Sequence, residues 1–293
     1  MIVYFDGLYL PKDEVRVSPD DRGFTFGDGV YEVIRAYEGR LFRCQDHVRR
    51  LARSLGELQI QAPALEGPGG IAEVAAELIR RNGLAGAGAA VYVQVTRGVA
   101  PRKHAFPPPG TTPTVYLAAS PLRSAAEAWE NGVGIILVPD IRWTRCDIKA
   151  VALLPSVLVS QQAVERGAEE AVFCRDGFIT EGAHTNVCAV FDGVLVTHPP
   201  TNLILDGITR RVVLGLCAGL GIPTREVPIP VGDLASAAEV MILGTTTEIK
   251  PVVQVDGRQV ADGRPGPVTR RLQAAYRALV AAETGARPLV AQA

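Results

Sequence analysis

The amino-acid sequence predicts a two-domain protein that mixes helices and strands, of the α+β or mixed α/β class. The chain has 293 residues, enough for two domains, and its 47% hydrophobic content suits well-filled cores. Segments with helix periodicity and segments with strand periodicity alternate along both halves. We expect a small N-terminal domain over 1–119, a connector over 120–126 and a larger C-terminal domain over 127–293.

The N-terminal half is typical of a sheet covered by helices. Short apolar runs on both sides of Asp6-Gly7 and of Gly39 predict two β-hairpins. Apolar residues at helical spacing predict helices over Gln45–Leu58 and Ile71–Arg81. The strands expected here are Ile2–Phe5, Leu8–Leu10, Val30–Tyr37, Leu41-Phe42, Ala89–Thr96 and Val115–Ala118.

The C-terminal half has the same mixture. Helices are expected over Ser156–Arg166, with Pro155 close to its start, over Thr209–Ala218 and over Thr269–Ala282. Asp-Gly pairs join two of the expected strand pairs. The strands expected here are Gly134–Pro139, Glu170–Cys174, Phe178–Thr180, Asn186–Phe191, Val194–Thr197, Val240–Leu243 and Val252–Val255.

Composition excludes several classes of function. The net charge of −1 provides no basic surface for nucleic acid or for an acidic membrane. The five cysteines are odd in number and form no CxxC pair, so we expect no disulfide framework, no zinc site and a reducing compartment. The N-terminus lacks the pattern of a signal peptide, and Pro155 interrupts the longest apolar run, Ala150–Val159. We therefore predict a cytoplasmic protein that binds neither metal nor membrane.

One lysine and one glutamate suit a pyridoxal phosphate (PLP) enzyme. Lys149 directly precedes an apolar run, and partial burial favours the neutral amine that must react with the cofactor aldehyde. Glu181 ends an expected strand about thirty residues later and can accept a hydrogen bond from the pyridine nitrogen. Considered singly, each also fits an ordinary surface lysine or a solvated turn glutamate.

Three further segments could bind anions. The turn Asp206-Gly207 opens a helix, so the N–H groups of Ile208 and Thr209 can face a phosphate. The segment Gly244–Glu248 fits either a helix cap or a hydroxyl-rich phosphate loop, and Pro251 favours the loop. Arg102 and His104 lie two apart in a basic loop, so both can face one side and hold a carboxylate.

A glycine-rich stretch suggests a rival class. Gly86–Val91 superficially matches a dinucleotide-binding fingerprint, which would indicate a nicotinamide dehydrogenase. That fingerprint must follow a strand and open a helix, whereas this stretch precedes an expected strand. We interpret it as a turn.

Taken together, these residues resemble the fold-type IV PLP enzymes, also called class IV aminotransferases, and among them the D-amino-acid transaminases. The resemblance extends from Asp6-Gly7 to Gly257. Its distinctive motifs are Asp21–Val33, Arg102-x-His104, Cys146-Asp147-Ile148-Lys149, Glu181-Gly182 with Asn186, and Gly207-Ile208-Thr209-Arg210.

The resemblance implies a role for each matching residue. Lys149 would bond to the cofactor and then move a proton between the substrate Cα and the cofactor, while Glu181 would hold the pyridine nitrogen. The phosphate would be bound by Arg50, the N–H groups of Ile208 and Thr209, and Thr245, with Leu205 packed on the ring. The substrate would be bound by Tyr31, Arg102 and His104 through its carboxylate, with Val33 shaping part of the pocket.

The resemblance also implies an assembly and an activity. In relatives the residues that match Arg102 and His104 come from the partner subunit, which implies a homodimer with PLP between the domains. The implied reaction converts a D-amino acid such as D-alanine, with 2-oxoglutarate, into pyruvate and D-glutamate. Alternatives on the same scaffold are an L-branched-chain transaminase, an (R)-amine transaminase and an aminodeoxychorismate lyase. A non-catalytic PLP-binding protein is a rival from another class.

The chain departs from the family pattern at a few positions. The serines usual after the glutamate-glycine pair are replaced by Ala183, His184 and Thr185, and a serine usual in the phosphate loop is replaced by Gly244. The resemblance places these positions around the cofactor, where substitutions affect the affinity for PLP and the electronic environment of its ring.

Overall fold

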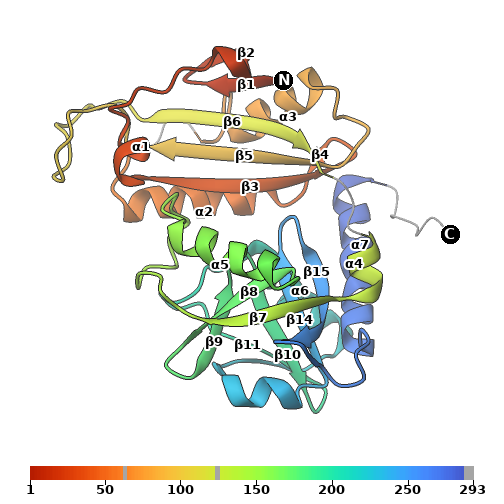
Figure 1. Ribbon diagram of the computed structural model, residues 1–293. Coiled ribbons are helices and arrows are strands. Elements are labelled where there is room, and N and C mark those ends of the chain that lie inside the picture. Colours follow the sequence, from red (N-terminus) through yellow and green to blue (C-terminus); the bar gives the residue numbers. More distant parts are fainter. Residues whose placement is uncertain (62–64, 123–125, 287–293) are drawn as a thin grey trace. The chain divides into compact units, whose positions relative to one another are not determined.

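The computed structural model describes residues 1–61, 65–122 and 126–286 and divides the chain into two compact units (Figure 1). Unit 1 comprises Met1–Ser124 with two short additions, Ile148–Leu153 and Glu283–Ala286. Unit 2 comprises Ala125–Asp147 and Leu154–Ala282. Part of the expected connector, 123–125, and the C-terminal residues 287–293 lie outside the described residues.

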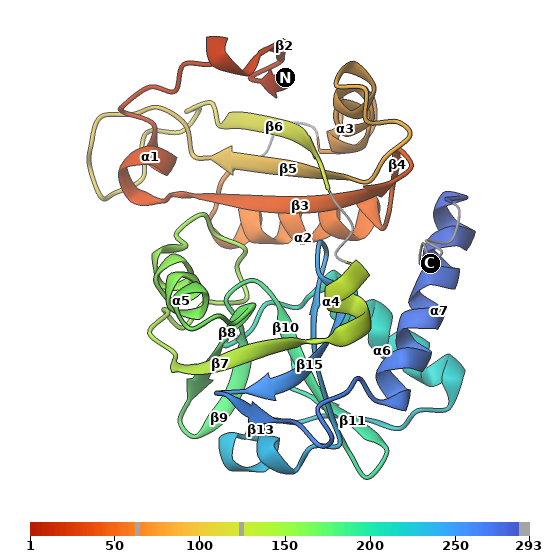
Figure 2. The same cartoon turned by 45° about the vertical axis from the view of Figure 1, so that its right-hand side comes forward.

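Unit 1 is built on a six-stranded antiparallel sheet with the order β2-β1-β6-β5-β3-β4 (Figure 2). Ser120 pairs with Ala90 in this sheet, so the last strand continues beyond the predicted end at Ala118. The strands are β1 (Ile2–Phe5), β2 (Leu8–Pro11), β3 (Gly29–Tyr37), β4 (Arg40–Leu41), β5 (Ala89–Thr96) and β6 (Thr114–Pro121).

The two faces of this sheet differ in what covers them. Helices α2 (Cys44–Glu57) and α3 (Ile71–Arg81) contribute apolar residues to one core with alternate residues of β3, β5 and β6. The other face carries a row of tyrosines, in which Tyr31 stacks on Tyr92 and Tyr92 lies beside Tyr116. The remaining helices of unit 1 are α1 (Arg22–Phe26) and the short 3-10 helix Lys12–Glu14.

The segment Ile148–Leu153 packs with unit 1 although the sequence placed it in the C-terminal domain. It pairs with the start of β3: Tyr31 N–H donates to the Lys149 carbonyl at 2.9 Å, and Val151 N–H donates to the Gly29 carbonyl at 3.0 Å. Ala150 is bridged to Val30 and is buried. Backbone pairing and apolar burial thus attach Lys149 to the small unit.

Unit 2 is built on a ten-stranded mixed sheet with the order β12-β11-β10-β14-β15-β7-β8-β9-β13, and β16 pairs with β15. One buried core takes residues from strands along most of this order, from Val196 of β11 to Ile229 of β13, so the sheet curves around its own core. The strands are β7 (Val133–Pro139), β8 (Glu170–Arg175), β9 (Phe178–Gly182), β10 (Asn186–Phe191), β11 (Val194–Thr197), β12 (Thr224–Glu226), β13 (Ile229–Pro230), β14 (Glu239–Gly244), β15 (Glu248–Val255) and β16 (Arg258–Gln259).

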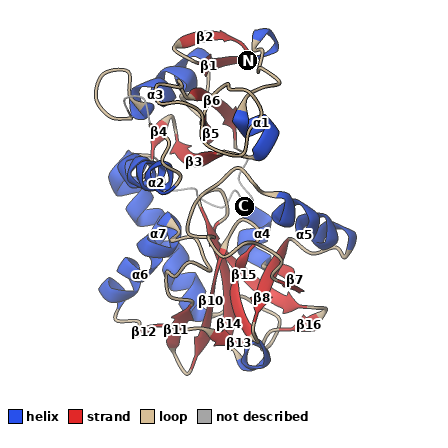
Figure 3. Ribbon diagram, turned by 90° about the vertical axis from the view of Figure 1, so that its left-hand side faces the viewer, coloured by secondary structure: helices blue, strands red, loops and turns tan. Residues whose placement is uncertain are grey.

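The helices of unit 2 flank this sheet on different sides (Figure 3). Helix α5 packs Val159 and Ala163 against β7 and β8. The helices are α4 (Ala126–Asn131), α5 (Leu154–Glu165), α6 (Ile208–Leu220) and α7 (Pro267–Thr284), with a 3-10 helix at Val231–Ser236. Among the described residues, no helix has the length and apolar character needed to cross a membrane. The prediction of a mixed helix and strand fold is confirmed.

Candidate active site

Lys149 of unit 1 carries a half-buried amine. Its side chain is half-buried, and its Nζ lies 4.3 Å from the centre of the Tyr31 ring. Within 1–61, 65–122 and 126–286, this Nζ has no hydrogen bond and no ion pair. Lys250, by contrast, is buried in an ion pair with Glu169. A half-buried amine without an anionic partner is available to bond covalently to an aldehyde.

The strand β3 presents two sets of side chains beside Lys149. Tyr31 and Val33 alternate with Glu32 and therefore share the face of the sheet that α2 does not cover. Ser54 of α2 accepts a hydrogen bond from the backbone N–H of Lys149 at 3.3 Å. The structure thus brings together Lys149 and Tyr31, and it places Val33 on the same face as Tyr31.

Arg50 is held by a buried carboxylate. Its Nε and Nη2 donate to the two oxygens of Glu32 at 2.7 and 2.9 Å, and His47 bonds the same carboxylate at 2.8 Å. Burial opposes ionisation of Glu32, but Arg50 and His47 outweigh it and hold its pKa well below the usual range. Desolvation lowers the pKa of His47. Arg50 is therefore firmly oriented, while its predicted contact with a phosphate stays a prediction.

Arg102 and His104 lie in the loop between β5 and β6, and both contact the ring of Phe26. The Arg102 Cζ lies 5.1 Å from the ring centre, and the two ring centroids of His104 and Phe26 are 5.6 Å apart. Buried Arg22 donates hydrogen bonds to the carbonyls of Lys103 at 2.6 Å and of His104 at 3.4 Å. One buried arginine therefore fixes the backbone of the loop while the two side chains remain exposed.

A β-bulge near the end of β9, in unit 2, sets the direction of the Glu181 side chain. Val172 of β8 pairs with Gly182, but Cys174 pairs with Ile179, so β9 contains one extra residue in the interval that holds Glu181. Such a bulge redirects the side chain at that point. The Oε2 of Glu181 accepts from the backbone N–H of Leu205 at 2.9 Å, which places Leu205 next to the carboxylate. Its packing on a cofactor ring stays a prediction.

Arg142 is the partner of Glu181 that sequence reasoning missed. Its Nη1 donates to Glu181 Oε1 at 2.5 Å, while its Nε and Nη2 both donate to Asp140 at 2.9 Å. Burial opposes ionisation of Asp140, but Arg142 outweighs it and lowers the pKa of Asp140. Arg142 cannot lose its proton, so it stabilises the anionic form of Glu181. No spacing rule connects residues 39 apart in sequence, so the pair had no sequence signal.

Asn186 links Glu181 to the start of α6. Its Nδ2 donates to Glu181 Oε2 at 3.2 Å and to the Leu205 carbonyl at 2.9 Å. A Cβ on Gly207 would lie 1.9 Å from Asn186 Oδ1, so this position has no room for a side chain. The sequence had marked Asn186 as part of a motif but gave it no role.

The N-terminus of α6 and the β14–β15 turn offer hydrogen-bond donors. The N–H groups of Ile208 and Thr209 lie in the first turn of a 13-residue helix, whose N-cap Gly207 makes no side-chain cap hydrogen bond. In the described part of the chain, the hydroxyls of Thr209 and Thr245 have no hydrogen-bond partner. Thr245 lies in a turn between two strands, so the segment is a loop and not a helix cap, while its contact with a phosphate stays a prediction. Uncommitted N–H and O–H donors at a helix N-terminus fit a phosphate.

Comparisons with known proteins show the family of the chain. A model of the family amino-transferase class IV matches residues 29–255. The chain belongs to this family. The D-alanine aminotransferase of Staphylococcus haemolyticus is 42% identical to the chain over 274 residues, which is 94% of the chain and 96% of that protein.

Solved structures of class IV aminotransferases share this fold. The branched-chain amino acid aminotransferase of Escherichia coli has a TM-score of 0.87 at 33% identity, and the match covers 97% of this chain and 95% of that one. The branched-chain aminotransferase of the archaeon Thermoproteus uzoniensis, solved with norvaline, has a TM-score of 0.84 at 30% identity, with 97% and 95% of the two chains covered. A branched-chain amino acid aminotransferase that is 29% identical was solved with pyridoxamine 5'-phosphate.

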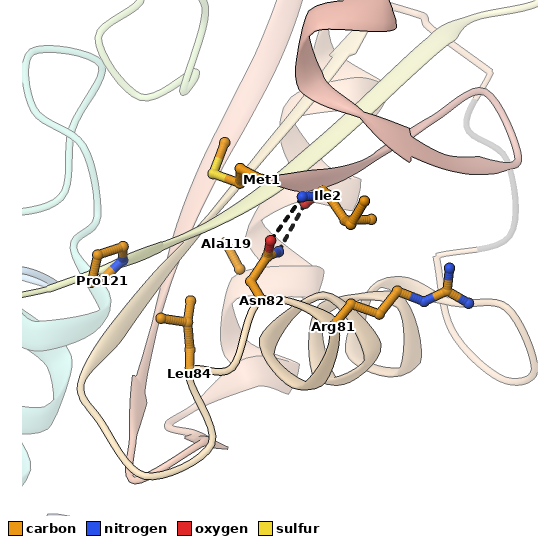
Figure 4. A pocket seen from close by; sticks show the side chains of 7 residues that line it. All are labelled: Met1, Ile2, Arg81, Asn82, Leu84, Ala119 and Pro121. Carbon is orange, nitrogen blue, oxygen red and sulfur yellow. Dashed lines mark hydrogen bonds between the residues drawn. The ribbon is translucent and has the colours of Figure 1, made fainter.

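This class IV aminotransferase also has a pocket that holds none of the predicted site residues. It lies in unit 1 beside the start of β1 and the end of α3, and it has a volume of about 490 Å³ (Figure 4). Asn82 exchanges two hydrogen bonds of 2.8 Å with the backbone of Ile2 at its wall. The lining residues are Met1, Ile2, Arg81, Asn82, Leu84, Ala119 and Pro121. Asn82 thus uses both its amide N–H and its amide oxygen within the fold, and the pocket gives no ground for a functional prediction.

Proposed function

We propose that this class IV aminotransferase is a PLP-dependent D-amino-acid transaminase that moves the amino group of a D-amino acid such as D-alanine to 2-oxoglutarate, giving pyruvate and D-glutamate. The residues fit the cofactor, because the Lys149 amine has no ionic partner among the described residues and Glu181 is held as an anion by Arg142. A class IV relative was solved with pyridoxamine 5'-phosphate, which supports the same cofactor here.

The protein residues supply positioning and proton transfer. When bound, PLP supplies an aldehyde that takes up the amino group and a ring that withdraws electrons from the substrate Cα. Glu181 would accept the hydrogen bond of the pyridine N–H, and Lys149 would remove and return the proton at Cα. The hydroxyls of Thr209 and Thr245, with the N–H groups at the start of α6, would donate to the phosphate.

One observation favours a D-amino acid: Arg102 and His104 both contact the ring of Phe26, and both side chains are exposed. A guanidinium beside an imidazole suits a substrate carboxylate, and the edge at which the carboxylate is held decides which enantiomer presents its Cα–H to the lysine. Relatives named D-alanine aminotransferase support this choice. The alternative is an L-branched-chain transaminase, which the names of the similar solved structures favour.

We further propose that the enzyme is a homodimer with Arg102 and His104 reaching the partner's site. Helix α5 supports a dimer, because its outer side exposes Leu154, Val157, Leu158 and Val164. An apolar helix side of this kind is typical of a protein interface. Sedimentation equilibrium tests the dimer, and a monomer at micromolar concentration would contradict it. The cytoplasmic location stays a prediction.

Arg102→Ala is expected to raise the KM for D-alanine by about tenfold to a hundredfold, because a charged hydrogen-bond pair is lost at the substrate carboxylate. The turnover of an amine without a carboxylate should change little. Lys103→Ala is the matched control, since Lys103 is an exposed cation in the same loop. Steady-state kinetics of the purified holoenzymes give the result, and an unchanged KM in Arg102→Ala would remove this residue from substrate binding.

A further inference from the structure

We propose that Glu170 and His184 form a positioning pair that holds the β9–β10 turn, and through it Glu181 and Asn186, in their working positions. The inference rests on the proposed function for the role of Glu181. His184 stands in the segment that directly follows Glu181-Gly182. No hydrogen bond of the described residues joins Glu170 or His184 to Glu181, so any effect of the pair on Glu181 passes through the turn.

The β9–β10 turn is the segment Gly182–Thr185. The buried carboxylate of Glu170 lies against Gly182, His184 and Thr185 of this turn. Its side chain is 1% exposed, and its Oε2 accepts from the Thr185 hydroxyl at 2.9 Å and from the His184 backbone N–H at 3.4 Å. A Cβ on Gly182 would lie 2.9 Å from this same oxygen, so the carboxylate packs directly on the residue that follows Glu181.

His184 supplies the cation of the pair. Its Nδ1 lies 2.9 Å from Glu170 Oε2, and its side chain is 55% exposed. The other charged groups that face it are Glu169, which precedes β8, and Lys250 of β15, and these two form an ion pair with each other. Glu169 thereby largely compensates the charge of Lys250, and His184 forms its ion pair with Glu170.

The turn transmits the position of this pair to the site because it is short and tightly bonded. Gly182 N–H donates to the Thr185 carbonyl at 2.7 Å, and Ala183 N–H donates to the Ala171 carbonyl at 2.9 Å. Glu181 and Asn186 lie immediately on either side of these residues and are bonded to each other at 3.2 Å. A displacement of the turn must therefore move the carboxylate or the amide that orients it.

The pair depends on pH in a defined direction. Partial desolvation lowers the pKa of His184, but the hydrogen bond and the charge of Glu170 outweigh it and raise that pKa above the ordinary value. A raised folded-state pKa gives stability that is fully present below the unfolded pKa and is lost as pH rises through the folded pKa. His198 provides the opposite case, because desolvation lowers its pKa, so its contribution is lost as pH falls.

The first experiment measures thermal unfolding of the apoprotein at about pH 5.5 and about pH 9, on either side of the ordinary histidine pKa of about 6.5. His184→Gln should lower Tm by about 2–4 °C at the acidic pH and by less at the alkaline pH. His184→Arg keeps a permanent cation and should hold Tm near the wild-type value at both. The matched control His198→Gln should show the opposite trend with pH. Equal losses in His184→Gln at both pH values would overturn the pair.

The second experiment connects the pair to the site through the dissociation constant of PLP, measured by fluorescence quenching. His184→Gln should weaken binding about threefold at the acidic pH, as for one partly exposed ion pair, and His184→Arg should restore it. Wild-type affinity in His184→Gln at that pH would overturn the positioning role. Failure of the wild-type protein to bind PLP would instead overturn the proposed function, while the apoprotein Tm values would still test the pair.

Discussion

Replacing Lys149 by alanine is expected to lower the rate of transamination by at least about 10⁴-fold, because the substitution removes the amine that we propose bonds to the cofactor and moves the Cα proton. The backbone of residue 149 pairs with Tyr31, and alanine retains that bond, so folding should be preserved. The measurement is turnover of D-alanine with 2-oxoglutarate by the purified variant, with circular dichroism as the check on folding.

Lys12→Ala is the control for this substitution, since Lys12 is an exposed lysine of the same unit. Its activity should equal that of the wild type. Near-normal turnover in Lys149→Ala would show that another group acts at Cα, and the assignment of Lys149 would have to be abandoned.

Replacing Glu181 by glutamine should lower kcat by about 10²–10³-fold, because a neutral amide cannot stabilise a protonated pyridine nitrogen as a carboxylate does. The substitution keeps the size of the side chain but leaves the charge of Arg142 less compensated. PLP should still bind, since the phosphate donors at the start of α6 are untouched. The bound cofactor should show an altered absorption spectrum.

Glu77→Gln serves as the isosteric control, because Glu77 lies on the exposed side of α3 and pairs only with Arg80 and Arg81 in the contacts described. It should leave both kcat and the cofactor spectrum unchanged. A Glu181→Gln enzyme with wild-type kcat and an unaltered spectrum would mean that another residue faces the pyridine nitrogen.

The periodic parts of the fold could be predicted because burial alone determines them. In α2 the apolar spacing through Val48, Leu51 and Leu55 marks the side that packs on the sheet, and the helix lies within a few residues of the prediction. Strand ends were less certain, since β6 continues to Pro121 only because β5 offers partners for its last residues. Local sequence does not report the length of a neighbouring strand.

The attachment of Lys149 to unit 1 could not be predicted for the same reason. Ile148–Leu153 lies between two segments of unit 2 in the sequence, and its place is set by backbone bonds to β3, which begins at Gly29. Backbone hydrogen bonds can form between residues of almost any type, so the sequence does not indicate which strand this segment pairs with. The apolar run after Lys149 indicated burial but could not indicate the partner.

The site residues divide in a similar way. The lysine, the glutamate and the Arg102-x-His104 loop could be predicted as site residues from their chemistry and their motifs, but the residues that orient them could not. Arg142 orients Glu181, Arg22 fixes the loop, and Glu32 holds Arg50. The sequence did contain one indication of the role of Glu32. This residue is charged, yet it stands at a position of β3 where the alternation of side chains predicts a buried residue.

A half-reaction distinguishes a D-specific transaminase that uses Lys149 and PLP from the alternatives on the same scaffold. Purified PLP-loaded protein is mixed separately with D-alanine, L-alanine, L-leucine or an (R)-arylalkylamine, without a 2-oxo acid, while the visible absorbance of the bound cofactor is followed. A D-specific enzyme should lose that absorbance with D-alanine and show no change with L-alanine or L-leucine. Loss with L-leucine or with the amine, and none with D-alanine, would contradict the assignment of Arg102 and His104.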